Sequence, residues 1–300
     1  MTPFAELLKS PHLLQNEPLA KYTAARLGGP ADYVYLARES TRELSDVLQA
    51  AWQQNIPVRV LGGGANVLVS DAGFRGLVVI NKVSEAAFKG TQVIVTSGYS
   101  LTILARKCAS QGLSGFEWAA SVPGTVGGAV VNNAGAHGGD MAGNVHTATI
   151  CDAEHGLQVL TKADLDYTYR TSALKRRVDR RFLVLMATLD LHKGDSAAIH
   201  AKMDEFIAHR KRTQPPGASL GSIFKNPPGD YAGRLIESLG LKGYSIGGAQ
   251  VSPVHANFFI NTGNATASDY FALIKYVQRM VLLATGVELE TEIETLGEGF

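Results

Sequence analysis

The clearest ionic group in this chain is Arg170, which follows Tyr169. A guanidinium carries a permanent charge, and its forked shape suits a carboxylate. Arg170 is therefore a candidate for holding the carboxylate of a substrate, with Tyr169 beside it. Because three further basic residues follow within the segment 169–177, a local salt bridge is the alternative role for Arg170.

A second polar group lies in the stretch 219–227. Ser222 offers a hydroxyl there, and Lys225 and Asn226 offer side-chain donors just beyond it. Arg212 ends a basic run ten residues before Ser222 and can help to bind phosphate. The alternatives are that Ser222 is a turn hydroxyl after a glycine, and that the basic run complements a helix C-terminus.

The C-terminal tail places an acid at every second position: Glu288, Glu290, Glu292 and Glu294. On a strand, which we expect from about 290 to 296, such residues share one face. The simplest interpretation of this pattern is that the four acids form a solvated surface. The alternative is that one of them takes part in catalysis.

Two glycine-rich loops can bring backbone close to an anion. They are Gly62-Gly63-Gly64-Ala65-Asn66-Val67 and Pro123-Gly124-Thr125-Val126-Gly127-Gly128, the latter extended by Asn133, Gly135 and His137. Glycine accepts positive φ, and successive N–H groups form an anion-binding nest. Neither loop fits the GxGxxG or GxxxxGK[ST] patterns, which disfavours a Rossmann dehydrogenase or a P-loop NTPase. Two such loops suit a long diphosphate ligand, of which FAD is one, although each alone can be a tight turn.

The elements that must position these groups alternate between strand and helix. Hydrophobic period and capping signals predict strands at 31–37, 58–61, 77–80, 92–97, 145–151, 156–161 and 182–191, and helices at 40–52, 100–111, 195–212 and 266–285. In the last helix we expect Phe271, Ile274, Val277, Val281 and Ala284 to be buried. A Pro-rich break at 213–217 reads as a boundary. We expect three parts: FAD-binding lobes at 1–90 and 91–205, and a substrate-binding domain at 206–300.

Composition narrows the class of protein. A net charge of +1 argues against a dedicated nucleic-acid binder. Cys108 and Cys151 lie in apolar surroundings and are expected to be buried thiols in a reducing compartment. The segment 1–20 lacks a signal-peptide pattern, no apolar run reaches the ~18 residues of a membrane span, and the eight histidines show no metal-binding spacing. We expect a cytoplasmic monomer that binds no catalytic metal, nucleic acid or membrane.

Seven segments, in order along nearly the whole chain, resemble the UDP-N-acetylenolpyruvoylglucosamine reductase family. They are Tyr22 to Asp32, Gly62 to Asn66, Pro123 to Gly128, Asn133 to Ala136, Tyr169 to Ser172, Gly221 to Pro227 and Gly248 to Phe258. The resemblance implies an α+β fold, with a two-lobed FAD-binding region of the vanillyl-alcohol-oxidase (PCMH) type followed by a smaller C-terminal substrate lobe. Within the family, the chain resembles the compact second subtype.

The resemblance also implies a reaction, the reduction of UDP-N-acetylglucosamine enolpyruvate to UDP-N-acetylmuramate for peptidoglycan synthesis. FAD is bound non-covalently and NADPH is the co-substrate. Addition of hydride at C3 of the enol ether builds negative charge at C2 and on the carboxylate. Arg170 matches the family's arginine at that carboxylate, Ser222 its proton donor, and Glu292 its C-terminal glutamate, with Glu290 as the alternative register.

One residue departs from the family pattern. His137 stands where the family commonly has tyrosine. A histidine can tether flavin covalently in related flavoproteins, but a wall of the flavin pocket or a plain turn residue fits this family better. His255 and Asn257 match a family segment, and we expect them to be a satisfied buried polar pair.

Two rival functions stay open from the sequence. An oxidase of the same fold would explain the glycine loops but not the Ser222 motif. A nucleotide-sugar-binding protein without flavin would explain the Ser222 motif but not the loops. The visible spectrum and the reactivity with oxygen separate the three readings.

Overall fold

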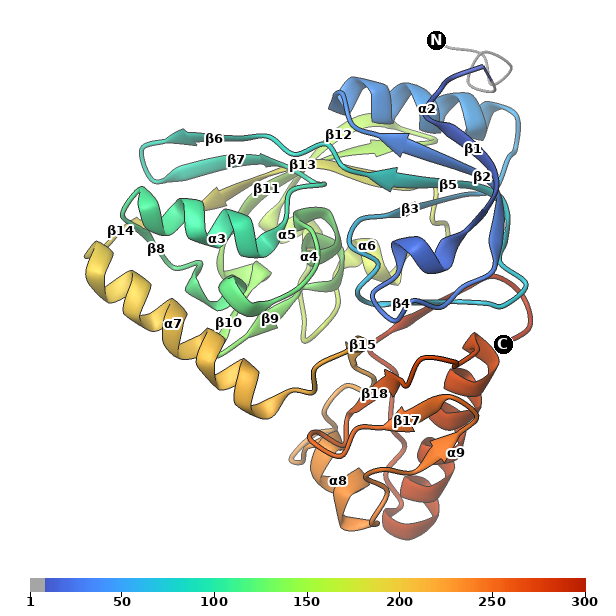
Figure 1. The fold of residues 1–300 in the computed structure, drawn as a ribbon. Coiled ribbons are helices and arrows are strands. Elements are labelled where there is room, and N and C mark those ends of the chain that lie inside the picture. Colours follow the sequence, from blue (N-terminus) through green and yellow to red (C-terminus); the bar gives the residue numbers. More distant parts are fainter. Residues whose placement is uncertain (1–8) are drawn as a thin grey trace. The chain divides into compact units, whose positions relative to one another are not determined.

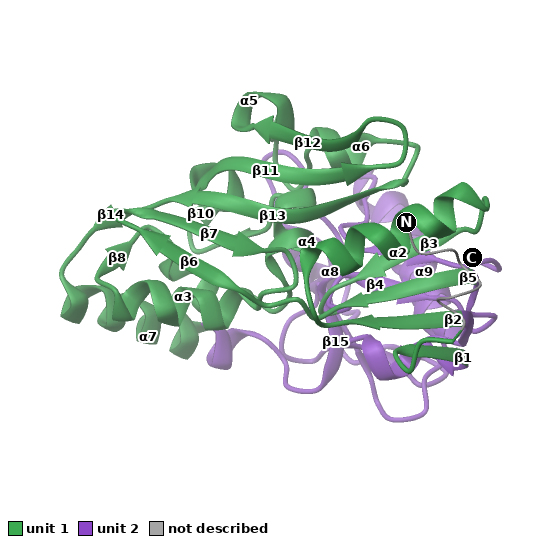
Figure 2. Ribbon diagram, turned by 90° about the horizontal axis from the view of Figure 1, so that it is seen from above, with its two compact units in different colours: residues 1–15, 33–63, 76–209 green, residues 16–32, 64–75, 210–300 purple. Residues whose placement is uncertain are grey.

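The computed structural model describes residues 9–300, which form two compact units. Unit 1 comprises the chain up to Gln15 and residues 33–63 and 76–209, and unit 2 comprises residues 16–32, 64–75 and 210–300 (Figure 2). Two N-terminal segments therefore belong with the C-terminal third of the chain. The three-part division made from the sequence stays a prediction, and the first eight residues of the segment expected to lack a signal peptide lie outside the described residues.

Two larger sheets underlie unit 1 (Figure 1). The first, mostly of unit 1 residues, has the order β1 (Leu13–Pro18), β2 (Pro30–Ala37), β5 (Phe74–Asn81), β3 (Val58–Leu61). The second is antiparallel, in the order β12 (Gly156–Thr161), β11 (Val145–Asp152), β13 (Phe182–Asp190), β7 (Gln92–Thr96), β6 (Ala86–Lys89). Unit 1 also contains two separate two-stranded sheets: β8 (Leu113–Ser114) with β14 (His192–Lys193), and β9 (Gly135–Ala136) with β10 (Gly139–Asp140).

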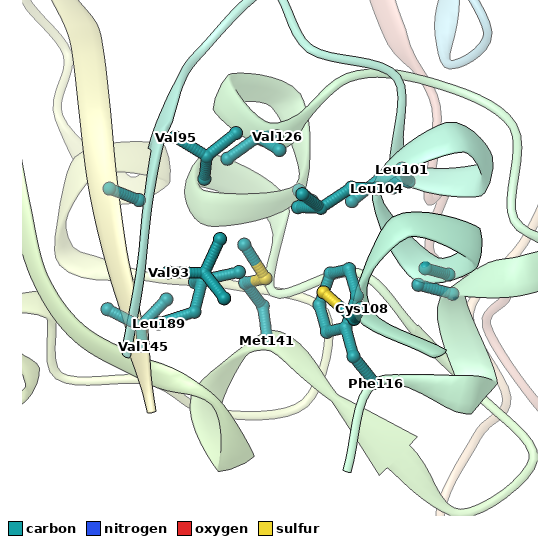
Figure 3. Packing of buried hydrophobic residues seen from close by; sticks show 14 of the residues in the cluster. Val93, Val95, Leu101, Leu104, Cys108, Phe116, Val126, Met141, Val145 and Leu189 are labelled. Atoms are coloured by element: carbon teal, nitrogen blue, oxygen red, sulfur yellow. The ribbon is translucent and has the colours of Figure 1, made fainter. Parts of the chain in front are cut away.

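Unit 1 has helices at the three places where the sequence predicted them: α2 (Thr41–Gln53), α3 (Leu101–Ser110) and most of α7 (Ser196–Thr213). Three short helices lie where the sequence predicted none: α4 (Val126–Asn132), α5 (Lys162–Leu165) and α6 (Ala173–Arg176). The apolar stripe of α3 packs toward the second sheet, and Figure 3 shows Met141 between Val93 of β7 and Cys108 of α3. Both cysteines are buried free thiols, as predicted.

Unit 2 combines a small sheet with two helices (Figure 1). The sheet has the order β15 (Ala218–Ser222), β18 (Phe258–Asn261), β17 (Ala249–Val251), β16 (Ser245–Ile246). The helices are α8 (Ala232–Ser238) and α9 (Ala267–Thr285). In addition, β4 (Val67–Val69) pairs in parallel with β19 (Glu294–Leu296). Thr266 caps α9 in a reciprocal box with Asp269. The predicted buried stripe holds through Val281, but Ala284 is exposed with the rest of the last turn, 282–285, and Phe271 is only half-buried.

Candidate active site

Ser222 ends strand β15, next to a kink in the backbone. The register between β15 and β18 shifts between Ser219 and Ser222, because β15 has one residue more than β18 there. Gly221 lies in this β-bulge and has φ +77°. Glycine takes this left-handed conformation without the steric cost that a side chain would bring. The bulge therefore sets the direction in which the strand presents Ser222, and Ser222 itself is half-buried.

The chain beyond Ser222 is paired on its other edge with the acidic tail. Glu292 N–H donates to Ile223 O at 2.8 Å, and Lys225 N–H donates to Glu290 O at 2.9 Å. Between these bonds, Phe224 and Thr291 form an antiparallel bridge. This pairing places the backbone of Glu292 opposite Ile223, the residue after Ser222, within unit 2.

The tail is not the single strand that the alternating acids predicted. The chain bends at 292–293, and β19 begins only at Glu294. The reason is a change of partner: Glu292 N–H bonds Ile223, whereas Glu294 N–H donates to Asn66 O at 2.9 Å. The four acids also differ in burial, because residues 288 and 290 are exposed whereas Glu292 and Glu294 are half-buried.

The predicted substrate-binding groups of unit 2 already have structural contacts. Lys225 Nζ forms a close ion pair with the carboxylate of Glu290, whose side chain is 72% exposed. Asn226 Oδ1 accepts a bond at 3.1 Å from the N–H of Ala232, where α8 begins. Arg212 lies exposed in the last turn of α7. These cations and amides lie on segments that flank Ser222 in sequence.

Within unit 1, the two glycine loops lie in close contact. A Cβ added to Gly62 would lie 2.1 Å from the side-chain Oγ1 of Thr125, and one added to Gly63 would lie 3.1 Å from the Cα of Gly124. A Cβ added to Gly127 would lie 2.8 Å from the Cβ of Ser97, and Gly127 donates its N–H to Ser97 O. Side chains at positions 62 and 127 are thus excluded, and one at position 63 would crowd the second loop. Pro123 and Gly128 are exposed at the two ends of the second loop.

The first loop continues into unit 2 at Gly64. This residue has φ +57°, and an added Cβ would lie 2.0 Å from Tyr22 O, so both conformation and space require glycine. Asn66 then holds the acidic tail, because its Nδ2 donates to Glu292 O at 3.2 Å, and Val67 begins β4. Across the described residues, the N–H groups of 63–65 have no hydrogen-bond acceptor.

Arg170 occupies a tight turn of unit 1 with φ +56°. Its guanidinium donates to Gly135 O at 2.6 Å and to Asn133 O at 3.4 Å, and it lies over the ring of the exposed Tyr169, 5.1 Å from its centroid. The buried Asn133 side chain in turn accepts from Ala142 N–H and donates to Thr168 O. The charge is therefore fixed to the segment that extends the second loop, and Asn133 supports that turn.

Further along the same segment, a buried ion pair anchors the turn of Arg170. Arg177 pairs with Asp152, whose side chain is 1% exposed. Burial alone would raise the pKa of Asp152, but hydrogen bonds from Arg177 and from the N–H groups of His155 and Glu154 outweigh it and lower the pKa to about 2.

His137 is a turn residue, one of the two roles expected of it. It precedes Gly138 in the two-residue turn between β9 and β10, where φ is +53° and +80°. Positive φ at both positions is the hairpin geometry that matches strand twist. Its ring stacks on Phe206 at 4.2 Å between centroids, and its Nε2 lies 3.2 Å from Ser121 Oγ.

Sequence reasoning assigned no functional role to one residue beside Ser222. Asn257 is 3% exposed, and its side chain makes two bonds to the backbone of Phe224. Its backbone N–H donates to His255 Nδ1 at 3.2 Å, so the predicted polar pair is present, but only Asn257 is buried and His255 is half-buried. The signals in the sequence were the family segment and an asparagine within the apolar stretch 256–260, and neither specifies the contact with Phe224.

Residues 9–300 contain no group of three His, Cys, Asp or Glu that could hold a metal ion. Over the same residues, no helix is both long and apolar enough to span a membrane.

Comparison with known proteins assigns the class first. Residues 33–164 match the family model of an FAD binding domain. The solved structure of Bermuda grass isoallergen BG60 shares the fold, with a TM-score of 0.50 at 18% identity over 63% of this chain and 44% of that one. The chain is a flavoprotein whose FAD-binding region is of the vanillyl-alcohol-oxidase type, which confirms the predicted α+β fold class.

The family follows from the remaining matches. Residues 212–296 match the model of the UDP-N-acetylenolpyruvoylglucosamine reductase C-terminal domain. The UDP-N-acetylenolpyruvoylglucosamine reductase of Caldanaerobacter subterraneus subsp. tengcongensis is 43% identical over 98% of this chain and 96% of its own. The solved Thermus caldophilus reductase is 33% identical, with a TM-score of 0.79 over 95% of this chain and 98% of that one. The chain belongs to the UDP-N-acetylenolpyruvoylglucosamine reductase family.

Proposed function

We propose that this protein reduces UDP-N-acetylglucosamine enolpyruvate to UDP-N-acetylmuramate, with NADPH as reductant and FAD as non-covalent cofactor. It would act as a cytoplasmic monomer in peptidoglycan precursor synthesis. The observation that carries the proposal is the strand pairing that sets the Ser222 segment against Glu292. An alternating acidic surface would need neither the bend at 292–293 nor the backbone bond between Glu292 and Ile223.

The glycine loops fit FAD. The close approach of Gly62 to Thr125 Oγ1 and of Gly63 to Gly124 leaves little room for side chains at positions 62 and 63, and the N–H groups of 63–65 are available to a diphosphate. Asn132 Oδ1, at the end of the second loop, is buried without a protein partner. The residues proposed to hold FAD are Gly62, Gly63, Gly64, Ala65, Asn66, Val67, Pro123, Gly124, Thr125, Gly127, Gly128, Asn133, Gly135 and His137. When bound, FAD would supply the hydride for C3.

The side chains of this protein would manage the charge and the proton. Arg170 would hold the substrate carboxylate, since a guanidinium carries a permanent charge and presents its N–H donors in a fork that fits a carboxylate. Ser222 would give its proton to C2, and Glu292 would polarise the enolate directly or through a water. A serine is a weak acid, so this step requires a strongly basic carbanion and a stabilised alkoxide.

The nucleotide would be held by Tyr169, Arg212, Lys225 and Asn226. Lys225 would exchange the exposed Glu290 carboxylate for phosphate, which carries more charge and more acceptor oxygens. The division into lobes 1–90 and 91–205 and a substrate domain 206–300 is part of this proposal.

Spectroscopy and anaerobic half-reactions test the function. The protein should purify yellow, release intact FAD on heating or acidification, be reduced by NADPH and be reoxidised by the enol ether. A parallel series with NADH measures the nucleotide preference. Fast reoxidation by oxygen with no response to the enol ether would support an oxidase instead. A colourless protein that binds UDP-sugar would support a binding protein, and flavin retained on the denatured chain would point to His137.

A further inference from the structure

Asn257 replaces a strand partner beside the Ser222 segment. Phe224 N–H donates to Asn257 Oδ1 at 2.9 Å, and Asn257 Nδ2 donates to Phe224 O at 2.8 Å. Its own carbonyl accepts the N–H of Ile223 at 2.9 Å. Three bonds from one residue therefore fix the backbone of two consecutive residues, Ile223 and Phe224, immediately after Ser222.

These bonds lie where regular pairing stops. Ser222 is the last residue of β15 to pair with β18, opposite Phe258. Past that point the side-chain amide of Asn257, just before β18, takes the place of the missing backbone. An amide can do so because it offers a donor and an acceptor in the same spacing as a peptide group.

The opposite edge of the same segment holds Glu292. Glu292 N–H bonds Ile223 O, and the Phe224–Thr291 bridge follows. A shift of the 223–224 backbone would therefore disturb the placement of both Ser222 and Glu292. We infer that Asn257 is a positioning residue that keeps the proton donor and the glutamate in register; this inference depends on the proposed function.

Substitution at Asn257 removes bonds that nothing nearby replaces. Phe224 is 1% exposed, so its N–H and C=O would stay buried without partners, which strongly favours a backbone shift. A displacement of about 1 Å near a reacting group can cost about 10²-fold in rate. Reduction by NADPH needs neither Ser222 nor Glu292 and should be spared.

Asn261 provides a matched control on the same strand. Its Oδ1 accepts from the N–H groups of Gly263 and Ala265, and its Nδ2 donates to Ala25 O. Its side chain makes three bonds to backbone groups, against two for the side chain of Asn257, but none to the segment 222–225. Asn261→Ala therefore reports the effect of losing a structural asparagine.

The experiment measures both half-reactions by stopped flow on flavin-loaded wild type, Asn257→Ala, Asn257→Asp and Asn261→Ala. We expect Asn257→Ala to slow reoxidation by the enol ether about 10²-fold, with reduction by NADPH within about 2-fold. Asn257→Asp should recover as the pH falls, because a protonated carboxyl regains the donor for Phe224 O. Asn261→Ala should lower thermal stability without changing the ratio of the two rates.

Two further measurements separate positioning from general stability. In a Ser222→Ala background, Asn257→Ala should cost less than about 3-fold in reoxidation, because residues that act through one another are not additive. Amide exchange of the peptide covering 219–226, measured on the flavin-free chain, should accelerate in the Asn257 variants and not in Asn261→Ala.

Equal losses in both half-reactions, the same rate ratio in Asn261→Ala, or unchanged amide exchange would overturn the inference. A wild type that is never reoxidised by the enol ether would refute the proposed function instead. In that case amide exchange still decides whether Asn257 holds the segment. If Asn257→Ala does not fold, Asn257→Asp carries the same comparison.

Discussion

The turn that carries Arg170 and the strand that carries Ser222 are held by different kinds of interaction. Arg170 sits at positive φ, bonds two carbonyls through its own guanidinium, and is followed by the buried Arg177–Asp152 ion pair. Ser222 lies on a strand fixed by backbone pairing on one side and by the neutral amide of Asn257 on the other.

This difference matches what each site is proposed to deliver. A charge acts over several ångströms and tolerates small shifts, so a turn anchored by side chains suffices for Arg170. A proton transfer needs donor and acceptor within hydrogen-bond reach, so the serine needs a strand whose register is fixed. The first arrangement also depends on ionisation, whereas the second does not.

The largest effect should come from Ser222→Ala, which removes the proton donor from the fixed strand. Reoxidation by the enol ether should fall by ~10²–10⁴-fold, with reduction by NADPH retained. Ser222→Cys should recover part of the rate, since a thiol has a reference pKa of about 8.5. Near wild-type reoxidation of Ser222→Ala in stopped flow would reduce the motif to a structural turn.

Arg170→Lys tests whether the turn delivers more than a charge. A lysine keeps the charge but not the forked guanidinium that bonds Gly135 O and Asn133 O and whose shape suits a carboxylate. We expect kcat/KM for the enol ether to fall by ~10²–10³-fold, the range seen when one stabilising donor is lost. Steady-state kinetics of wild type, Arg170→Lys and Arg170→Ala measure this loss. A fully active lysine variant would show that charge alone suffices.

Glu292→Gln and Glu290→Gln form a pair that tests the register of the tail. Glu292→Gln should slow reoxidation by about 10²-fold without affecting reduction by NADPH. Glu290→Gln frees Lys225 from its ion pair and should change the KM for the enol ether only a few-fold. A large loss in Glu290→Gln alone would show that the functional register is shifted by one alternation.

Acid should affect the Arg170 side of the comparison before the Ser222 side. The pKa of Asp152 is lowered to about 2 in the folded state, so its stabilisation is complete above the ordinary pKa near 3.9 and disappears as the pH falls toward 2. Asp152→Asn should cost about 2 kcal/mol of unfolding free energy at pH 7 and flatten the acid dependence.

Denaturant titrations between pH 2 and 7 measure the unfolding free energy of wild type and Asp152→Asn. Asp179→Asn is the control, because it removes an exposed carboxylate near the same Arg177. An acid profile unchanged by Asp152→Asn would mean that the ion pair does not anchor the turn.

The sequence alone determined the features that depend on near neighbours. The apolar period of residues 266–285 predicted α9, and glycines at 62–64 and 124 marked loops that pack closely. The order of motifs gave the family. These signals succeed because a helix cap or a tight turn is settled by residues within about four positions.

Only the tertiary structure decided how distant segments meet. Asn66 bonds the tail at Glu292, and Asn257 holds Phe224; neither contact has a signal in the local pattern. The same pairing broke the expected strand at 290–296 and separated Glu292 from its exposed neighbours. Alternation along a strand fixes which residues share a face, but the partner of each face depends on how chain segments far apart in sequence come together.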